Sequence, residues 1–141
     1  MENRILPATK SDADFICNKL IEYNLLMVPK RQETAFENLD RKIVDGSGKI
    51  IGGIVARMYC WSVVYIDILW VDEAYRKKGI GKILLNDIEK TAKAKNVTLI
   101  HLDTFDFQAK DFYLKNGYEI FGILEECPSG GHCRYYLKKY L

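Results

Sequence analysis

The chain has 141 residues, of which 48% are hydrophobic and 12% aromatic, and its formal net charge is +2. This length fits one domain, residues 1–141, and the apolar content excludes a disordered chain. The small net charge, with basic residues local rather than spread in a stripe, predicts no nucleic-acid partner. No apolar run is long enough to span a bilayer and the N-terminus lacks a signal-peptide core, so we expect a cytoplasmic protein without a membrane partner.

The first half of the chain predicts helices followed by a β-hairpin. Apolar residues repeat at helical spacing after Ser11, the expected N-cap, and Pro29 closes this stretch. A turn of Asp, Gly, Ser and Gly at residues 45–48 separates two strand-like runs and is typical of a hairpin. In chain order the predicted elements are a strand at residues 5–6, a helix from 11 to about 26, a short helix at 33–39, and hairpin strands at 42–44 and 49–59.

The second half predicts a buried strand followed by alternating helices and strands. Val63–Val71 is apolar at nearly every position, so we expect a central strand covered on both faces. The remaining predicted elements are a helix from Ile80, a strand at 97–102, a helix at 108–116 closed by Gly117, and strands at 118–124 and 133–137. This order indicates a mixed sheet with helices, in the α/β or α+β class.

A basic turn with two glycines directly follows the central strand and reads Arg-Lys-Lys-Gly-Ile-Gly over residues 76–81. Gly79 and Gly81 permit backbone conformations closed to other residues and a close approach to a ligand. The free N–H groups at the start of the following helix favour an anion. Positive charge is added by Arg76, Lys77, Lys78 and Lys82. The turn therefore predicts a phosphate site, although neither a dinucleotide fingerprint nor a P-loop fits its glycine order.

At this point the sequence resembles the GNAT superfamily of N-acetyltransferases. One motif is the turn itself, which matches Arg or Gln, two residues, Gly, one residue, and Gly or Ala. The second is QAKDFYLKNGY at residues 108–118, with Ala109, Tyr113, Gly117 and Tyr118 at the family's positions. The element order agrees over almost the whole chain. The resemblance implies a mixed, mostly antiparallel twisted sheet with a splayed central parallel strand pair and helices on both faces.

The resemblance also implies acetyl-CoA as the acetyl donor. Its pyrophosphate would lie on the glycine turn, and its pantetheine arm along the splayed edge of the central strand, near a bulge at residues 69–71. Where the family often carries Asn, this chain has Asp106, so Gln108 is a candidate replacement. The residues implied in binding the cofactor are Leu69, Trp70, Val71, Arg76, Lys77, Lys78, Gly79, Ile80, Gly81, Lys82, Asp106, Gln108 and Tyr113.

Three residues are candidates for the acid–base chemistry of acetyl transfer. Tyr113 matches the family tyrosine near the CoA sulfur, which makes it the candidate general acid. Asp67 stands alone in an apolar strand, where burial would raise its pKa, and is either the base that deprotonates the amine or a structural carboxylate. His132 follows two glycines in the last hairpin and is a further candidate for an acid–base or substrate contact.

The acceptor is expected to be a primary amine of a small molecule or peptide, attacked directly in a ternary complex. The segments at 14–36 and 125–135 are expected to contact it, and a homodimer is left open. No metal is expected, because the spacing of Cys127, His132 and Cys133 is not a zinc signature. Two alternatives stay open at this point: a CoA-binding sensor or interaction module without turnover, and a regulator that acetylates proteins.

Overall fold

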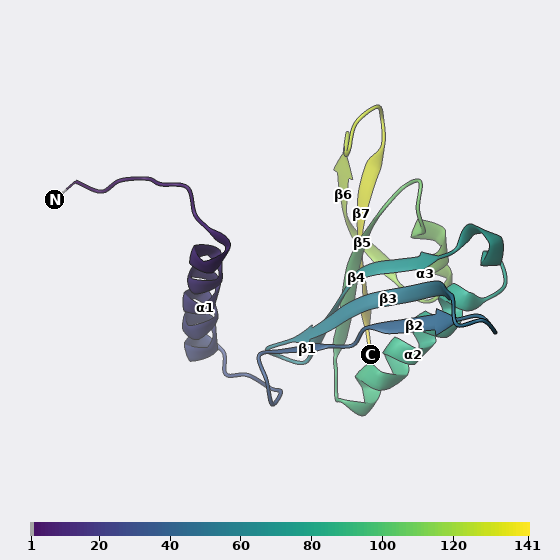
Figure 1. Ribbon diagram of the computed structural model, residues 1–141, viewed down its shortest axis with the longest axis horizontal. Coiled ribbons are helices and arrows are strands. Elements are labelled where there is room, and N and C mark those ends of the chain that lie inside the picture. Colours follow the sequence, from purple (N-terminus) through teal and green to yellow (C-terminus); the bar gives the residue numbers. More distant parts are fainter. Residues whose placement is uncertain (1) are drawn as a thin grey trace.

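The computed structural model describes residues 2–141 and is built around one mixed sheet (Figure 1). The helices are α1 (Lys10–Met27), α2 (Ile80–Ala94) and α3 (Lys110–Lys115), with a short 3-10 helix η1 (Glu73–Tyr75) before α2. The strands are β1 (Phe36–Asn38), β2 (Arg41–Val44), β3 (Ile50–Tyr59), β4 (Val63–Val71), β5 (Leu99–Phe105), β6 (Glu119–Glu125) and β7 (Cys133–Tyr140).

The sheet runs in the order β1-β3-β4-β5-β7-β6, with β2 also paired to β3. Every pairing is antiparallel except that of β4 with β5, which follow one another through α2 and are parallel. The predicted central position of residues 63–71 is therefore confirmed, as are the mostly antiparallel sheet and its parallel pair.

Helices α2 and α3 pack together against one face of the sheet. Leu85, Ile88 and Ala92 of α2 are buried there with Tyr113 of α3 and Leu137 of β7. The contact between the two helices is close, since a Cβ added at Gly81 would lie 3.5 Å from the ring of Phe112. This side of the sheet holds the hydrophobic core of the protein.

The opposite face, called here the outer face, is not covered by any helix of residues 2–141 (Figure 1). Alternation along β3 and β4 directs Val55, Ile68 and Trp70 to this face, and all three side chains are exposed. The prediction that the strand at 63–71 is covered on both faces is therefore wrong for a single chain. A near-continuous apolar run indicates that both faces of the strand are apolar. It does not indicate whether the same chain or another molecule covers the outer face.

The N-terminal elements differ most from the prediction. Thr9, not Ser11, caps α1, because its side chain accepts a hydrogen bond from Asp12 N–H and Asp12 bonds back to Thr9 N–H. Residues 5–6 form no strand. The expected short helix at 33–39 is instead the edge strand β1, because Phe36–Asn38 pairs with the end of β3.

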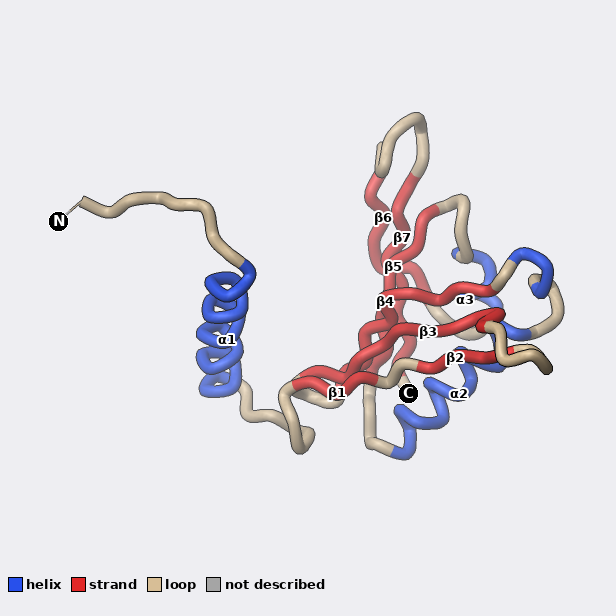
Figure 2. The backbone as a smooth tube through the Cα atoms, in the orientation of Figure 1, coloured by secondary structure: helices blue, strands red, loops and turns tan. Residues whose placement is uncertain are grey.

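Helix α1 stands away from the sheet, at the left of Figure 1, and is joined to β1 by an irregular segment that Figure 2 shows as loop. No residue of α1 is buried. We refer to residues 2–27 as the arm. Among the described residues, no helix is long and apolar enough to cross a membrane.

Candidate active site

The turn at residues 76–81 has the geometry of an anion site. Lys77 and Gly79 both have positive φ, 62° and 81°, and Gly79 caps α2 without any side-chain hydrogen bond. The backbone N–H groups of residues 77–82 form no hydrogen bond with any part of the chain that the structure describes. A left-handed turn followed by a helix start leaves such groups free to bind phosphate oxygens.

The two glycines of the turn have different roles. A Cβ added at Gly79 would meet nothing within 4 Å, so this residue faces open space. A Cβ at Gly81 would instead face Phe112 and Val71 in the protein interior. Gly79 therefore leaves the turn open on one side, whereas Gly81 allows the close packing of α2 against α3.

The positive charge around the turn is only partly free. Arg76 donates from Nε to the carbonyl oxygen of Val71 at 3.1 Å, which folds its side chain back onto the end of β4. Lys78 lies over the ring of Tyr75, with Nζ 5.4 Å from the ring centroid. Both side chains remain exposed, as do Lys77 and Lys82, so the turn keeps the countercharge predicted for it.

The central strands separate beside this turn. Strand β4 pairs with β5 only from Val63 to Ile66, although β4 continues to Val71 and β5 to Phe105. Residues 67–71 therefore have a strand partner only on the β3 side. The expected splaying of the parallel pair is therefore present. An edge of this kind offers free backbone N–H and C=O groups to an extended ligand.

The bulge lies earlier in β4 than predicted. The register of β3 with β4 shifts where Val55 pairs with Ile68 and Ala56 pairs with Ile66, so that Asp67 is the extra residue. The expected bulge at residues 69–71 is therefore wrong by a few residues. Leu69 and Trp70 pair regularly with Ile54 and Gly53.

Asp67 is exposed, so the prediction that this carboxylate is buried is wrong. The bulge places it at the point where β4 and β5 begin to separate. A carboxylate at this position is in contact with water. The bulge thus explains how an otherwise apolar strand can carry a carboxylate, because the bulge places this side chain in water.

Tyr113 is buried in the core with a side chain only 4% exposed. Its hydroxyl has no hydrogen-bond partner among the described residues. No fully buried side-chain polar atom of those residues lacks a partner, so the Tyr113 hydroxyl is not fully buried and reaches a surface. Burial, and secondarily the negative charge of Asp103, raises the pKa of Tyr113 well above the ordinary tyrosine value. The phenol therefore keeps its proton throughout the neutral range.

His132 and Asp106 lie together although they are far apart in sequence. His132 Nδ1 lies 3.1 Å from both carboxylate oxygens of Asp106, and its ring packs edge-on against Phe107. Slight desolvation raises the pKa of Asp106, but the hydrogen bond with His132 and backbone contacts outweigh it and hold this pKa below its usual value. The pair is a carboxylate-oriented imidazole on the last hairpin.

Gln108 has a local structural role. Its side-chain oxygen accepts from Phe105 N–H at 2.8 Å and from the Thr104 hydroxyl at 3.2 Å. These bonds close the turn between β5 and α3. The side-chain oxygen of Gln108 is therefore already engaged within the protein, which weakens its case as the replacement for the family asparagine.

A polar network on the outer face was not predicted from the sequence. Asp103 accepts from the Tyr65 hydroxyl and from Arg134 Nε, both at 2.8 Å. Burial, with the hydrogen bond to Asp103, raises the pKa of Tyr65 to about 12. The Tyr59 hydroxyl lies 2.8 Å from His101 Nε2 on the same face. The alternation of polar residues along β5 is the signal that could have identified this network.

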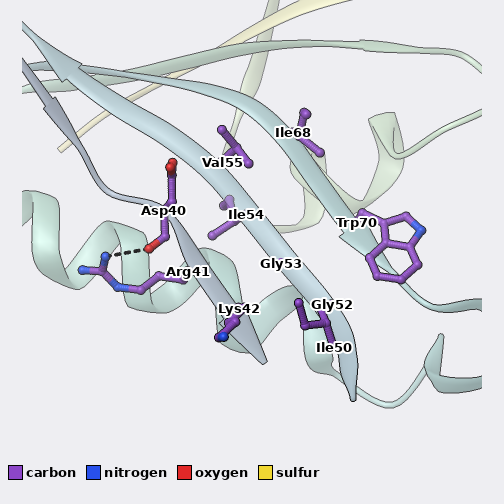
Figure 3. A pocket seen from close by; sticks show the side chains of 10 residues that line it. All are labelled: Asp40, Arg41, Lys42, Ile50, Gly52, Gly53, Ile54, Val55, Ile68 and Trp70. Atoms are coloured by element: carbon purple, nitrogen blue, oxygen red, sulfur yellow. Dashed lines mark hydrogen bonds between the residues drawn. The ribbon is translucent and has the colours of Figure 1, made fainter. Parts of the chain in front are cut away.

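A shallow groove of about 450 Å³ lies beside the end of β4 (Figure 3). Its floor is β3, and Val55, Ile68 and Trp70 of the outer face form its apolar lining. Arg41 lies at the groove but donates to the carbonyl oxygen of Asp40 and to Asp87. The full lining is Asp40, Arg41, Lys42, Ile50, Gly52, Gly53, Ile54, Val55, Ile68 and Trp70.

Comparison with known proteins agrees with this geometry. The model of the acetyltransferase (GNAT) family matches residues 14–118. The chain belongs to the GNAT acetyltransferase family. This GNAT chain is 32% identical over 84 residues to the blasticidin-S acetyltransferase of Streptomyces morookaense, an alignment covering 59% of this chain and 61% of that protein. The match thus spans less than two thirds of the length of this curated relative.

Solved structures give the same fold. A crystal structure of an acetyltransferase from Bacillus cereus is 38% identical, with a TM-score of 0.89 over 99% of this chain and 98% of that one. A Bacillus anthracis protein, described as a candidate streptothricin acetyltransferase and solved with acetyl coenzyme A, is 27% identical, with a TM-score of 0.64 over 74% of this chain and 62% of that one. The free N–H groups at 77–82, the open space at Gly79 and the unpaired edge of β4 fit acetyl-CoA.

Proposed function

We propose that this GNAT chain is an acetyl-CoA-dependent N-acetyltransferase that acetylates a primary amine of a small molecule or peptide by direct attack in a ternary complex. The observation that carries the proposal is the run of unbonded N–H groups at residues 77–82 beside the unpaired edge of β4. Acetyl-CoA, when bound, supplies a thioester whose acetyl group is transferred. The turn would hold its phosphates, and the N–H and C=O groups of residues 67–71 would hold its extended arm.

In this proposal Tyr113 donates the proton that the departing thiolate needs. A phenol with a raised pKa stays protonated at the pH of the reaction, and its hydroxyl reaches a surface of the core. A general acid must carry its proton when the bond breaks, and Tyr113 meets this condition. None of the four cysteines lies in either motif, which favours direct attack over an acetyl-cysteine intermediate.

Asp67 is proposed as the base that removes a proton from the amine, through water. Its exposure at the bulge makes its carboxylate accessible to a water molecule beside the amine. His132, oriented by Asp106, is the alternative base, because a neutral imidazole held by a carboxylate can also accept a proton.

We expect Asp67→Asn to lower the rate at neutral pH far more than at alkaline pH, where the amine loses its proton unaided. A loss of about 10²-fold or more at neutral pH is the general-base range. The measurement is a pH–rate profile of acetyl transfer, with His132→Gln as the matched variant. A wild-type profile in Asp67→Asn, together with a shifted acidic limb in His132→Gln, would reassign the base to His132.

The acceptor is best sought among cationic amines. Glu125 and Glu126 of the last hairpin are exposed near the Asp106–His132 pair and offer negative charge. Blasticidin S and streptothricin enter the panel of amines because two relatives carry these names. Release of CoA thiol with any member of the panel supports transferase activity, whereas tight CoA binding with no turnover on the whole panel would favour a CoA-binding sensor.

A further inference from the structure

We propose that two copies of this chain exchange their arms, so that α1 of each copy packs on the outer face of the other copy's sheet and completes its acceptor site. The exchange itself depends only on the surfaces of the arm and the sheet. Only its consequence for the acceptor rests on the proposed function.

The arm is built to be buried. Helix α1 has 18 residues and no buried residue, yet a helix of this length is marginal in water without tertiary packing. Its apolar residues occupy several sides of the second half, which is typical of a helix that is enclosed. Large exposed apolar side chains of the arm are Ile5, Leu6, Phe15, Ile16, Leu20, Tyr23, Leu26 and Met27.

The outer face supplies a matching surface. Trp70 is 45% exposed and Ile68 51%, and they line the groove of about 450 Å³ together with Val55. Phe36 of the edge strand is also exposed. The arm and the outer face thus both expose contiguous apolar surface, and they do not touch each other. Exposed apolar surface of this kind indicates that each one binds another molecule.

The arm of the same chain is not positioned to cover this face. The segment after α1 is fixed to the β3–β4 turn, because Trp61 Nε1 donates to Val28 O and Arg31 N–H donates to Cys60 O, both at 2.8 Å. Gln32 adds bonds to Ser62 N–H and to Met58 O. Val28 caps α1 directly through its N–H to Asn24 O, so no slack chain separates the helix from this anchor. Folding α1 back would break the helix end or the anchor.

The same placement occurs in a crystal structure. The acetyltransferase from Bacillus cereus superposes with a TM-score of 0.89 over 99% of this chain. A TM-score averages over every residue, and the arm is nearly a fifth of the chain. A different position of the arm in that crystal could not give so high a value. The extended arm is therefore a conformation that a folded relative adopts.

A reciprocal exchange satisfies both surfaces at once. In a two-fold dimer the same contact forms twice, and two arms with these apolar residues can bury the roughly 1,000 Å² or more of a stable interface. Segments 14–36 and 125–135, predicted to contact the acceptor, lie on separate parts of one chain in Figure 1. The exchange brings α1 of the second copy to the face that carries Asp67 and Trp70.

The first test measures the mass of the full-length protein in solution by light scattering and sedimentation. We expect a dimer for the wild type and a dimer dissociation constant at least tenfold higher for Leu20→Glu. Asn18→Glu is the matched control, because this substitution adds the same charge at an exposed position. Residue 18 lies on the side of α1 opposite to Leu20. A monomeric wild type, or equal dissociation constants for the two variants, would overturn the proposal.

The second test separates exchange from an arm that folds back. Chains labelled with ¹⁵N are mixed with unlabelled chains, refolded together and cross-linked with an amine-reactive reagent. Cross-links between Lys19 of α1 and Lys42 of the groove are then read by mass spectrometry. Exchange predicts pairs that carry both isotopes. Pairs of one isotope only would show closure within a chain and refute the exchange. Neither test uses acetyl-CoA, so both are independent of the proposed activity.

Discussion

Tyr113→Phe is expected to lower kcat by about 10²- to 10⁴-fold, the usual contribution of a general acid. The affinity for acetyl-CoA should change little, because the ring that packs in the core is retained. Because the pKa of Tyr113 is raised, its phenol should still be protonated near pH 10, the ordinary tyrosine pKa. The wild-type rate should therefore not fall at that pH through deprotonation of Tyr113. Stopped-flow measurement of thiol release gives the chemical step directly.

Tyr118→Phe is the matched control for this prediction. Tyr118 is as buried as Tyr113 and packs edge-on against it, but its hydroxyl donates to Glu89 Oε1 at 3.0 Å. Loss of that bond should cost about 1–2 kcal/mol of stability, with kcat nearly unchanged. Equal kcat values for the two variants would assign Tyr113 to packing alone.

Gly79→Ala is expected to weaken CoA binding by at least about tenfold, or 1.4 kcal/mol. Gly79 has a φ of 81°, where a side chain costs roughly 1–2 kcal/mol, and its Cβ would enter the open space in front of the free N–H groups. Isothermal titration with CoA measures the effect.

Gly81→Ala provides the comparison. Its added methyl group would make ordinary contact with Phe112 at 3.5 Å, away from the ligand side of the turn. CoA affinity should therefore stay close to that of the wild type. If Gly81→Ala loses affinity and Gly79→Ala does not, the ligand side of the turn has been assigned to the wrong glycine.

Much of the sheet could be predicted from local patterns. The apolar run of β4, the Asp45 turn and the αL glycine at 117 each act over a few residues, and each lies where it was expected. The basic glycine turn was likewise recognisable, because its charges, glycines and helix start are adjacent in sequence.

What the sequence could not predict depends on contacts between distant residues. The motif does not say which way a side chain at Gly81 would point, and that direction is set by Phe112 on another helix. Asp67 was expected to be buried because its neighbours are apolar, but a bulge and an uncovered face expose it. The pairing of His132 with Asp106 arises only when the last hairpin folds beside β5.

The position of the arm is the largest departure. Helical periodicity correctly predicted α1, yet periodicity gives only the presence of an apolar surface and not the surface that meets it. The anchor at Val28 and Trp61 directs α1 away from its own sheet. No pattern within residues 10–27 encodes that direction.

The central claim is that this chain moves an acetyl group from acetyl-CoA to an amine. The most direct measurement follows thiol release and the mass of each amine in the panel, with wild type and Tyr113→Phe side by side. We predict an amine product heavier by one acetyl group, formed in proportion to the released thiol and much more slowly in Tyr113→Phe. Equal product from both proteins would remove Tyr113 from the chemistry and leave the transfer itself standing. CoA bound at the turn with no acetylated amine from any member of the panel would contradict the central claim.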